Sequence, residues 1–267
     1  IDEPENFQSF IKNRGGKKRK DLISVSNKIP YYYHRYNRFG FNVHEIKNKA
    51  LSVSESETMK EVYADYTSPA IVSYRKKLFG HVKICPYCSL GETEHLDHYL
   101  PKSLFSEYAL YTSNLIPCCY KCNSEYKKTE YKISDQRVYF HPFIDKINDF
   151  ELVKVSLRWV GNNLVINYSI SNGSGISSPL YLVLKKHFSS LGLRIRYLTF
   201  ATSYIEDMNP RFMEDYGVEK DQNKFIAAID FRYRDSIHSC GINHWQTALL
   251  KALKNDDKFT SGGFLNM

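Results

Sequence analysis

The sequence has few of the features that mark membrane or secreted proteins. No run comes near the roughly 18 consecutive apolar residues that a membrane-spanning helix needs, and no apolar signal segment lies near the start. Internal repeats and low-complexity tracts are also missing. These absences predict a cytoplasmic protein with no membrane partner.

Acidic residues are fewer than basic ones. The chain has 37 Lys and Arg and 29 Asp and Glu, which gives a net charge of +8. A basic balance favours polyanionic partners, because each neutralised phosphate releases counterions from a nucleic acid. Hydrophobic residues make up 42% of the 267 positions, enough for a real core. The sequence therefore predicts a globular protein whose partner is nucleic acid.

The six cysteines are not spread along the chain, as the disulfides of a small secreted protein would be. Two pairs have C-x-x-C spacing, Cys85 with Cys88 and Cys119 with Cys122. Four thiolates in two such pairs suit the closed tetrahedral shell of a structural Zn²⁺. The spacing therefore predicts a structural zinc site.

The two other cysteines are Cys118 and Cys240. Cys118 adjoins Cys119 and is a rival ligand, but only Cys119 has C-x-x-C spacing with Cys122. We therefore prefer Cys119 as the ligand. Cys240 lies far from the cluster and is predicted to be a small buried apolar residue.

Asp97 and His98 follow each other between the two cysteine pairs. Histidine has the side-chain pKa nearest neutrality, so His98 can take a proton from water. Asp97 can bind Mg²⁺ or Mn²⁺, and Asn123, directly after the last thiol, can offer a second ligand through its amide oxygen. Adjacent side chains on a regular strand point to opposite faces, so we expect a bend at His98 that brings both to one ion.

Several pieces of the segment 85–128 together resemble the HNH (ββα-metal) endonucleases, in the branch whose core is stapled by zinc. The pieces are Leu96-Asp97-His98-x-x-Pro101-Lys102, Asn114-Leu115, and Cys119-x-x-Cys122-Asn123 followed by Lys127 and Lys128. The resemblance implies two strands and a helix around a catalytic Mg²⁺ or Mn²⁺, with the zinc structural and distant from the chemistry.

The resemblance also implies a role for each matching residue. Asp97 and Asn123 would bind the catalytic metal, and His98 would be the general base. Asn114 would orient the loop that carries His98 through backbone hydrogen bonds. The residues expected to contact substrate phosphates are Lys102, Lys127 and Lys128.

An alternative register remains open just upstream, because Glu94 and His95 form a second acid–histidine pair. Several HNH sequences of the Septu type carry Glu-His where this chain has Asp97 and His98. We favour His98 because Pro101 and Lys102 follow it at the spacing of the family.

The rest of the chain predicts helices and one hairpin around this core. We expect an N-terminal basic and helical region at 1–80, the nuclease core at 81–145, and a hairpin with helices at 146–267. The predicted elements are a helix from Ser54 with a capping box to Glu57, a helix from Pro69 to Gly80, strands at 151–159 and 164–171, and helices at 180–191, 193–207, 221–237 and 242–254. The predicted fold class is α+β, with a β-hairpin, a mostly helical C-terminal region and the zinc-stapled ββα-metal core that the resemblance implies.

Two charged runs lie in the first region. Lys17–Lys20 is predicted to be a solvated loop. The run 31–38 interleaves tyrosines with cations, which suits nucleic acid, but packing of the tyrosines in the core is the favoured interpretation. Trp245 is likewise expected in the core, and His141 in a packed turn.

These features predict a metal-dependent endonuclease that hydrolyses phosphodiester bonds in DNA, with RNA as an open alternative. A weaker resemblance, at 141–143 and 241–245, is to HNH proteins of bacterial antiphage systems, including Septu-like and retron-associated nucleases. It implies a defence effector with an ATPase or another partner in a defence complex. The alternative is a zinc-stapled subunit that binds nucleic acid without catalysis.

Overall fold

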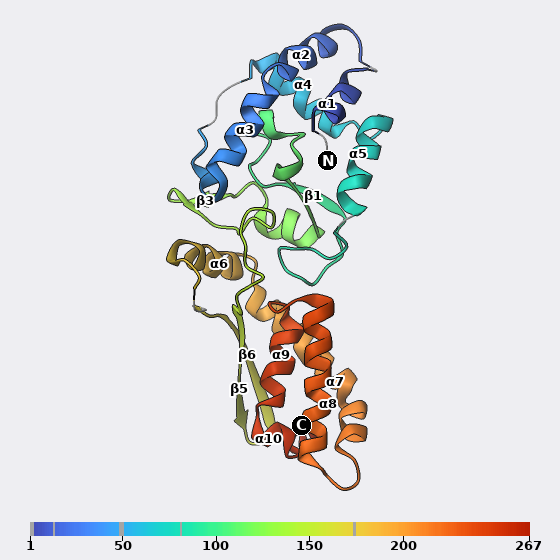
Figure 1. Ribbon diagram of the computed structural model, residues 1–267, viewed down its shortest axis with the longest axis vertical. Helices are drawn as coiled ribbons and strands as arrows, with labels where there is room; N and C mark the ends of the chain where they lie inside the picture. Colours follow the sequence, from blue (N-terminus) through green and yellow to red (C-terminus); the bar gives the residue numbers. More distant parts are fainter. Residues whose placement is uncertain (1–2, 13, 48–50, 81, 173–174) are drawn as a thin grey trace. The chain divides into compact units, whose positions relative to one another are not determined.

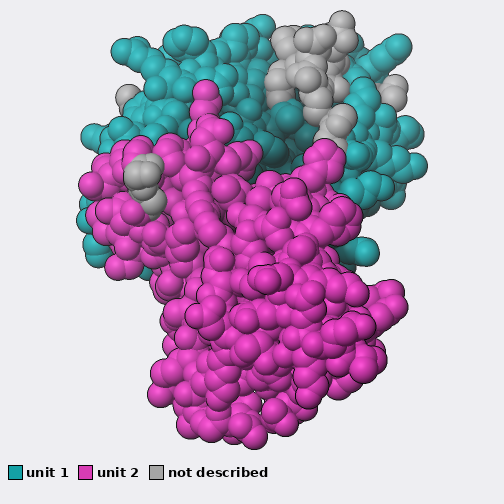
Figure 2. Space-filling model, turned by 60° about the horizontal axis from the view of Figure 1, so that its bottom comes forward, with its two compact units in different colours: residues 1–145 teal, residues 146–267 magenta. Residues whose placement is uncertain are grey.

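The computed structural model describes residues 3–12, 14–47, 51–80, 82–172 and 175–267. The chain divides into two compact units, residues 1–145 and 146–267, which Figure 2 shows in separate colours. Both units combine helices with small antiparallel sheets, so the fold is α+β. Within the described ranges, no helix has both the length and the apolar character that crossing a membrane requires.

Helices make up the first half of unit 1 (Figure 1). Helix α2 packs on α4, while α1 contacts both α2 and α5. Leu22 and Val25 of α2 and Met59 and Val62 of α4 are buried. The elements are α1 (Glu3–Lys12), α2 (Gly16–Ser26), α3 (Ile29–Phe39), the 3-10 helix η1 (Gly40–Glu45), α4 (Val53–Ala64) and α5 (Pro69–Gly80).

The basic run Lys17–Lys20 forms the start of α2, so its prediction as a loop was wrong. Its four side chains are exposed. Leu22 and Val25, which follow it, are fully buried. Tertiary packing of an apolar face supplies most of the stability of a helix. Here the packing of Leu22 and Val25 stabilises a helix whose first turn is the charged run.

Helix α4 begins earlier than predicted, because the capping box is formed by Ser52 and Glu55. The Ser52 backbone N–H donates to Glu55 Oε2 at 2.8 Å, and the Glu55 N–H donates to Ser52 Oγ at 3.3 Å. The predicted cap residue Ser54 instead donates to Asp21 of α2 at 2.6 Å. Both Ser-x-x-Glu pairs fit the motif, and contacts with neighbouring helices select between them.

The second half of unit 1 has the order strand, loop, strand, helix. Strand β1 (His95–His98) pairs antiparallel with β2 (Leu115–Cys118), with His95 opposite Cys118 and His98 opposite Leu115. The π-helix η4 (Lys121–Lys127) follows and contacts β1. The remaining elements are η2 (Ser106–Tyr108) and η3 (Thr112–Asn114) in the loop, and the short strands β3 (Lys132–Ile133) and β4 (Gln136–Arg137).

Residues 1–80 and 81–145 form one unit, so the predicted boundary near residue 80 was wrong. Tyr36 of α3 donates its hydroxyl to Asn114 Oδ1 at 3.2 Å, and Tyr63 of α4 donates to the Leu96 carbonyl at 3.2 Å. Buried tyrosines bury apolar area and still find partners for their hydroxyls. They join the N-terminal helices to the strand region in one core.

Unit 2 contains the predicted hairpin and the predicted helices. Gly161 has a φ of +61° in the tight turn between the strands, as a two-residue hairpin loop requires. Strand β5 contacts α9, and β6 contacts α7. The elements are β5 (Val153–Val160), β6 (Asn163–Ile170), α6 (Ser178–Ser190), α7 (Leu193–Tyr216), α8 (Gln222–Cys240), α9 (Trp245–Lys254), α10 (Asp257–Thr260) and η5 (Gly263–Asn266).

Helix α7 continues past the predicted end at 207 and through Pro210. A proline inside a helix removes one backbone hydrogen bond and costs about 3 kcal/mol. Phe212 and Tyr216 lie beyond it and are buried, and both rings pack against Phe225. This aromatic packing offsets the cost of the proline.

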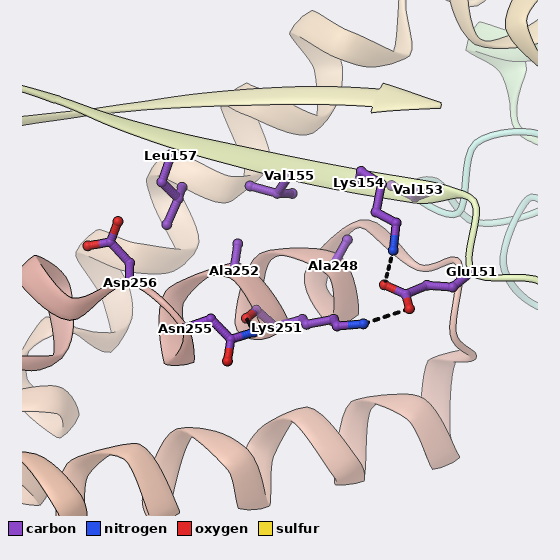
Figure 3. A pocket seen from close by; sticks show the side chains of 10 residues that line it. All are labelled: Glu151, Val153, Lys154, Val155, Leu157, Ala248, Lys251, Ala252, Asn255 and Asp256. Atoms are coloured by element: carbon purple, nitrogen blue, oxygen red, sulfur yellow. Dashed lines mark hydrogen bonds and ion pairs between the residues drawn. The ribbon is translucent and has the colours of Figure 1, made fainter. Parts of the chain in front are cut away.

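A groove of about 300 Å³ lies between β5 and α9 (Figure 3). Ala248 and Ala252 of α9 face it, and small side chains there let the helix approach the strand. At one end, Glu151 accepts from Lys154 and from Lys251 at 2.6 Å each. These ion pairs link the start of the hairpin to α9.

Glu55 connects three helices of unit 1. Its Oε1 accepts from Lys28 Nζ and from Ser24 Oγ, both at 2.6 Å. Burial alone would raise the pKa of Glu55, but hydrogen bonds from Lys28, Ser24 and Ser52 lower it to about 2. A depressed carboxylate pKa contributes stability above the unfolded-state pKa of about 4.3, and this contribution is lost as the pH falls towards 2.

We therefore expect the stability difference between wild type and Glu55→Gln to depend on pH. The difference should be largest above pH ~5 and vanish near pH ~2, with an upper bound of about 3 kcal/mol. It will be smaller than this bound because the Lys28 side chain is 41% exposed. Urea unfolding at several pH values measures it, and a difference that stays constant with pH would contradict the role of Glu55.

Candidate functional site

Four cysteines gather at one point of unit 1. The Sγ atoms of Cys85, Cys88, Cys119 and Cys122 lie within 4.8 Å of one another, and all four residues are buried. The Sγ atoms of Cys88 and Cys119 are 3.8 Å apart. Tetrahedral Zn–S bonds of about 2.3 Å place sulfurs about 3.8 Å from each other. The cluster therefore fits a structural metal such as zinc, and the prediction from the spacing is confirmed to that extent.

The backbone around the first pair turns tightly. The Ser89 N–H donates to the Cys85 carbonyl at 2.7 Å, and the Cys85 N–H donates to the Gly91 carbonyl at 2.8 Å. A Cβ at Gly91 would lie 2.8 Å from the Cβ of Cys119, closer than real Cβ contacts. The absence of a side chain at Gly91 thus lets the two cysteine pairs approach.

The other two cysteines, Cys118 and Cys240, lie outside the cluster. Cys118 is buried but outside the cluster, which confirms the preference for Cys119. Burial raises the pKa of Cys118 well above its ordinary value, so it stays a protonated thiol. Cys240 is exposed at the last position of α8, so the prediction that it is buried was wrong.

Strand β1 directs Asp97 and His98 to different surroundings. Its pairing with β2 is regular, and the predicted bend at His98 does not occur. The ring of His98 packs against Tyr63 of α4, with the centroids 4.4 Å apart. Asp97 instead bonds Lys127 of η4 and Tyr87, which lies between the two cysteines of the first pair. The alternation of side chains along a strand therefore separates the two residues that were expected to share one ion.

A hydrogen bond to a backbone carbonyl shows which ring nitrogen of His98 carries the proton. Nε2 lies 3.0 Å from the carbonyl oxygen of Ala109. A carbonyl only accepts, so Nε2 carries the proton and Nδ1 of the neutral ring is an acceptor without a partner among the described residues. Burial, together with the charge of Lys102, lowers the pKa of His98 to about 3. The ring is therefore neutral near pH 7 and can accept a proton at Nδ1.

Asn114 holds the loop that supplies this carbonyl. Its Oδ1 accepts from the Leu100 N–H at 2.8 Å, and its Nδ2 donates to the carbonyls of Leu100 and Tyr108 at 3.1 and 3.2 Å. Tyr108 directly precedes Ala109, which bonds His98. The backbone contacts expected of Asn114 are therefore present, while its catalytic role stays a prediction.

Two residues behind this loop were not identified as site residues in the sequence. Tyr36 donates to Asn114 Oδ1, and its hydroxyl lies 3.0 Å from His141 Nε2. Both Tyr36 and His141 are fully buried. His141 is thus a packed turn residue as predicted, and burial lowers its pKa to about 3. No local pattern marks these residues, because their partners are distant in the sequence.

Asp97 lies in a closed set of polar groups. Both of its carboxylate oxygens are 3.0 Å from Lys127 Nζ, and Tyr87 donates its hydroxyl to Oδ2 at 2.8 Å. The side chains of Asp97 and Lys127 are 2% and 0% exposed. The prediction that Lys127 contacts substrate phosphates was wrong, because its ammonium is buried in this ion pair.

This arrangement of Asp97 does not fit the predicted catalytic Mg²⁺ or Mn²⁺. Mg²⁺ takes oxygen ligands at about 2.0–2.1 Å and keeps several waters. The ammonium of Lys127 already neutralises the carboxylate and stands beside both of its oxygens. No catalytic step is therefore assigned to a metal at Asp97.

The other predicted residues on η4 are more open. Asn123 is half-buried, and its carbonyl accepts from the Lys128 N–H at 2.8 Å, the i to i+5 bond of a π-helix. Lys128 is exposed at the end of this helix. The metal role of Asn123 and the phosphate contact of Lys128 stay predictions.

The alternative pair lies at the start of β1, at the end of the strand opposite His98. Glu94 accepts from the Tyr120 N–H at 3.1 Å, and the ring of His95 lies 5.5 Å from that of Tyr120. Both residues thus contact the start of η4 next to the second cysteine pair. This placement gives Glu94 a structural contact at the beginning of a helix.

Two cations lie beside His98. The guanidinium of Arg75, from α5, is 4.3 Å from the ring centroid of Tyr63 and 4.1 Å from that of Tyr66. Lys102 Nζ lies 5.2 Å from the centroid of the Tyr63 ring. The pKa of Lys102 is lowered, mainly by burial and secondly by the positive charge of Arg75. Neither cation has a carboxylate partner in the part of the chain that the structure describes. Such a pair favours an anionic ligand.

Arg75 is the residue that sequence reasoning missed. It stands between charged neighbours on α5, where exposed cations are usually only solvated. In the structure its Nη2 donates to the Tyr63 carbonyl at 2.8 Å, and its Nε is buried with no acceptor among the described residues. No signal in the sequence distinguished it from Lys76 and Lys77.

Comparison with known proteins identifies one relationship. Protein ea31 of Escherichia phage lambda is 32% identical over 216 residues, which cover 74% of this chain and 70% of the phage protein. The chain belongs to the ea31 family. No protein-family model matches the chain, and no solved structure matches it. The name of ea31 states no activity, so the function has to be argued from the site.

We expect Cys88→Ser to lose the metal and destabilise unit 1, because structural zinc contributes about 10–16 kcal/mol of binding free energy to folding. Cys118→Ser is the matched control, since Cys118 is equally buried but outside the cluster. Zinc content by mass spectrometry and thermal unfolding measure both effects. Full zinc content in Cys88→Ser, or loss in Cys118→Ser, would contradict the assigned ligands.

Proposed function

We propose that this chain is an HNH endonuclease that hydrolyses phosphodiester bonds in nucleic acid, mainly DNA, with His98 as the general base. The observation that carries this proposal is the hydrogen bond from His98 Nε2 to the Ala109 carbonyl. It leaves Nδ1 as an acceptor, while Tyr63 and the loop held by Asn114 fix the ring. A positioned general base contributes about 10²–10⁴-fold to a rate when its pKa lies near the operating pH. The pKa of His98 is about 3 without a ligand, and the negative charge of a bound phosphate beside the ring would raise it.

The reaction follows from the groups around His98. A water oxygen adds to phosphorus and the bond to the leaving oxygen breaks, while the proton of the water passes to His98 Nδ1. Arg75 and Lys102 would hold phosphate oxygens and stabilise the developing negative charge. The leaving oxygen takes its proton from solvent. The four-cysteine cluster, with zinc bound, would keep this frame rigid.

The order of elements between residues 95 and 127 also supports the proposal. Strand, loop, strand and helix follow one another as the resemblance to the HNH family implies. The role of defence effector, with an ATPase partner, stays a prediction of the weaker resemblance. Similarity to a phage protein gives that role no support.

A second candidate is a zinc-stapled module that binds nucleic acid without cleaving it. The observation that favours it is the burial of Asp97 with Lys127, which removes the expected metal ligand from the surface. The net charge of +8 fits both candidates. Only an assay of cleavage separates them.

We expect His98→Ala to lower cleavage by at least about 100-fold, because the proton acceptor is removed. Zinc-loaded protein would be incubated with supercoiled plasmid, and in parallel with single-stranded DNA and RNA, in buffer containing Mg²⁺. The matched control is His95→Ala, on the same strand, which should cut like wild type. If cleavage requires His95 but not His98, the alternative register at Glu94 and His95 is correct. If the protein binds nucleic acid but cleaves none of the substrates, it is the non-catalytic binding module.

We expect Arg75→Met and Lys102→Met each to weaken binding of DNA about tenfold and to lower the slope of log K against log salt by about 1. Methionine keeps the aliphatic stem and removes the charge. Lys76→Met, on the exposed face of α5, is the control. Fluorescence anisotropy at several salt concentrations measures binding, and effects no larger than that of Lys76→Met would contradict the phosphate contacts.

A further inference from the structure

The ammonium of Lys127 is enclosed by oxygen atoms. Its Nζ lies 3.0 Å from both carboxylate oxygens of Asp97, 3.2 Å from the His98 carbonyl oxygen and 3.4 Å from the Tyr99 carbonyl oxygen. The rings of Tyr99 and Tyr139 lie 5.8 Å from Nζ. The Lys127 side chain is fully buried. One carboxylate and two backbone carbonyls therefore form a cage around a single cation.

Charge and hydrogen bonding explain why this cation is retained. A buried charge is tolerated only when it is paired and its remaining donors are bonded. The three N–H groups of Lys127 have three acceptor groups here: the Asp97 carboxylate and the carbonyls of His98 and Tyr99. The aromatic faces add a favourable cation–π contribution. The set is complete as it stands.

The same oxygens are those that a hard divalent ion would use. Carboxylate and carbonyl oxygens are the preferred ligands of Mg²⁺ and Mn²⁺. An ammonium and a divalent ion beside one carboxylate would repel each other in a buried site. The cage can hold one of the two, and in this structure it holds Lys127.

We propose that Lys127 is the resident cation of the Asp97 cage, and that its ammonium and a divalent metal ion exclude each other there. The bonds of Lys127 to the His98 and Tyr99 carbonyls also hold the end of β1 that carries the His98 ring. This proposal is independent of the proposed nuclease activity, since it concerns binding of an ion.

Binding of Mn²⁺ tests the exclusion directly. Zinc-loaded wild type, Lys127→Ala and the double variant Asp97→Asn/Lys127→Ala would be titrated with Mn²⁺, with free Mn²⁺ followed by electron paramagnetic resonance. Lys127→Ala opens the cage and leaves the Asp97 carboxylate unpaired. We expect Lys127→Ala to bind one equivalent of Mn²⁺ more than the double variant, and wild type to bind the same amount as the double variant.

Two results would overturn the proposal. One is a wild type that binds an additional equivalent relative to the double variant, since Asp97 would then take a metal with Lys127 present. The other is a folded Lys127→Ala that gains no equivalent. If Lys127→Ala does not fold, wild type against the charge-neutral double variant still tests the first part of the proposal, that the Asp97 cage takes no metal ion while Lys127 occupies it. Lys128→Ala, at the exposed neighbour, is the control and should match wild type.

Discussion

Four cysteine sulfurs fix the geometry on which the rest of unit 1 depends. The two pairs stand before β1 and after β2, and each of these strands has four residues. Two short strands are not stable by themselves, whereas a bound structural metal contributes folding free energy. Tyr87, inside the first pair, donates to Asp97 on β1. The metal site is thus connected by one hydrogen bond to the strand that carries His98.

The alternation of β1 then creates two different electrostatic environments a single residue apart. On one side, His98 is a neutral ring beside Arg75 and Lys102, which have no carboxylate partner among the described residues. On the other, Asp97 and Lys127 neutralise each other away from water. The first environment favours an anionic ligand, and the second is already satisfied. In this member of the ea31 family, His98, which can accept a proton, and Asp97, which was expected to share one metal ion with it, therefore lie in separate environments.

Local patterns predicted much of the fold. The cysteine spacing predicted the four-thiol cluster, and the turn at Gly161 predicted the hairpin, because both depend on residues a few positions apart. Errors arose where a neighbouring element decides the outcome. The contacts of Ser54 and Glu55 with other helices shift the start of α4, and packing of Phe212 carries α7 through Pro210. Propensity alone cannot weigh such contacts.

The sequence by itself determined the four thiols, the hairpin and most of the helices after residue 53, since short-range spacing and periodicity specify them. Only the tertiary structure decided the chemistry of the candidate site. The partner of Asp97 is thirty residues away, the carbonyl that fixes the proton on His98 is eleven residues away, and Arg75 comes from a separate helix. Proton position and ion pairing depend on atoms within about 3 Å in space, and the chain brings these atoms together only when it folds.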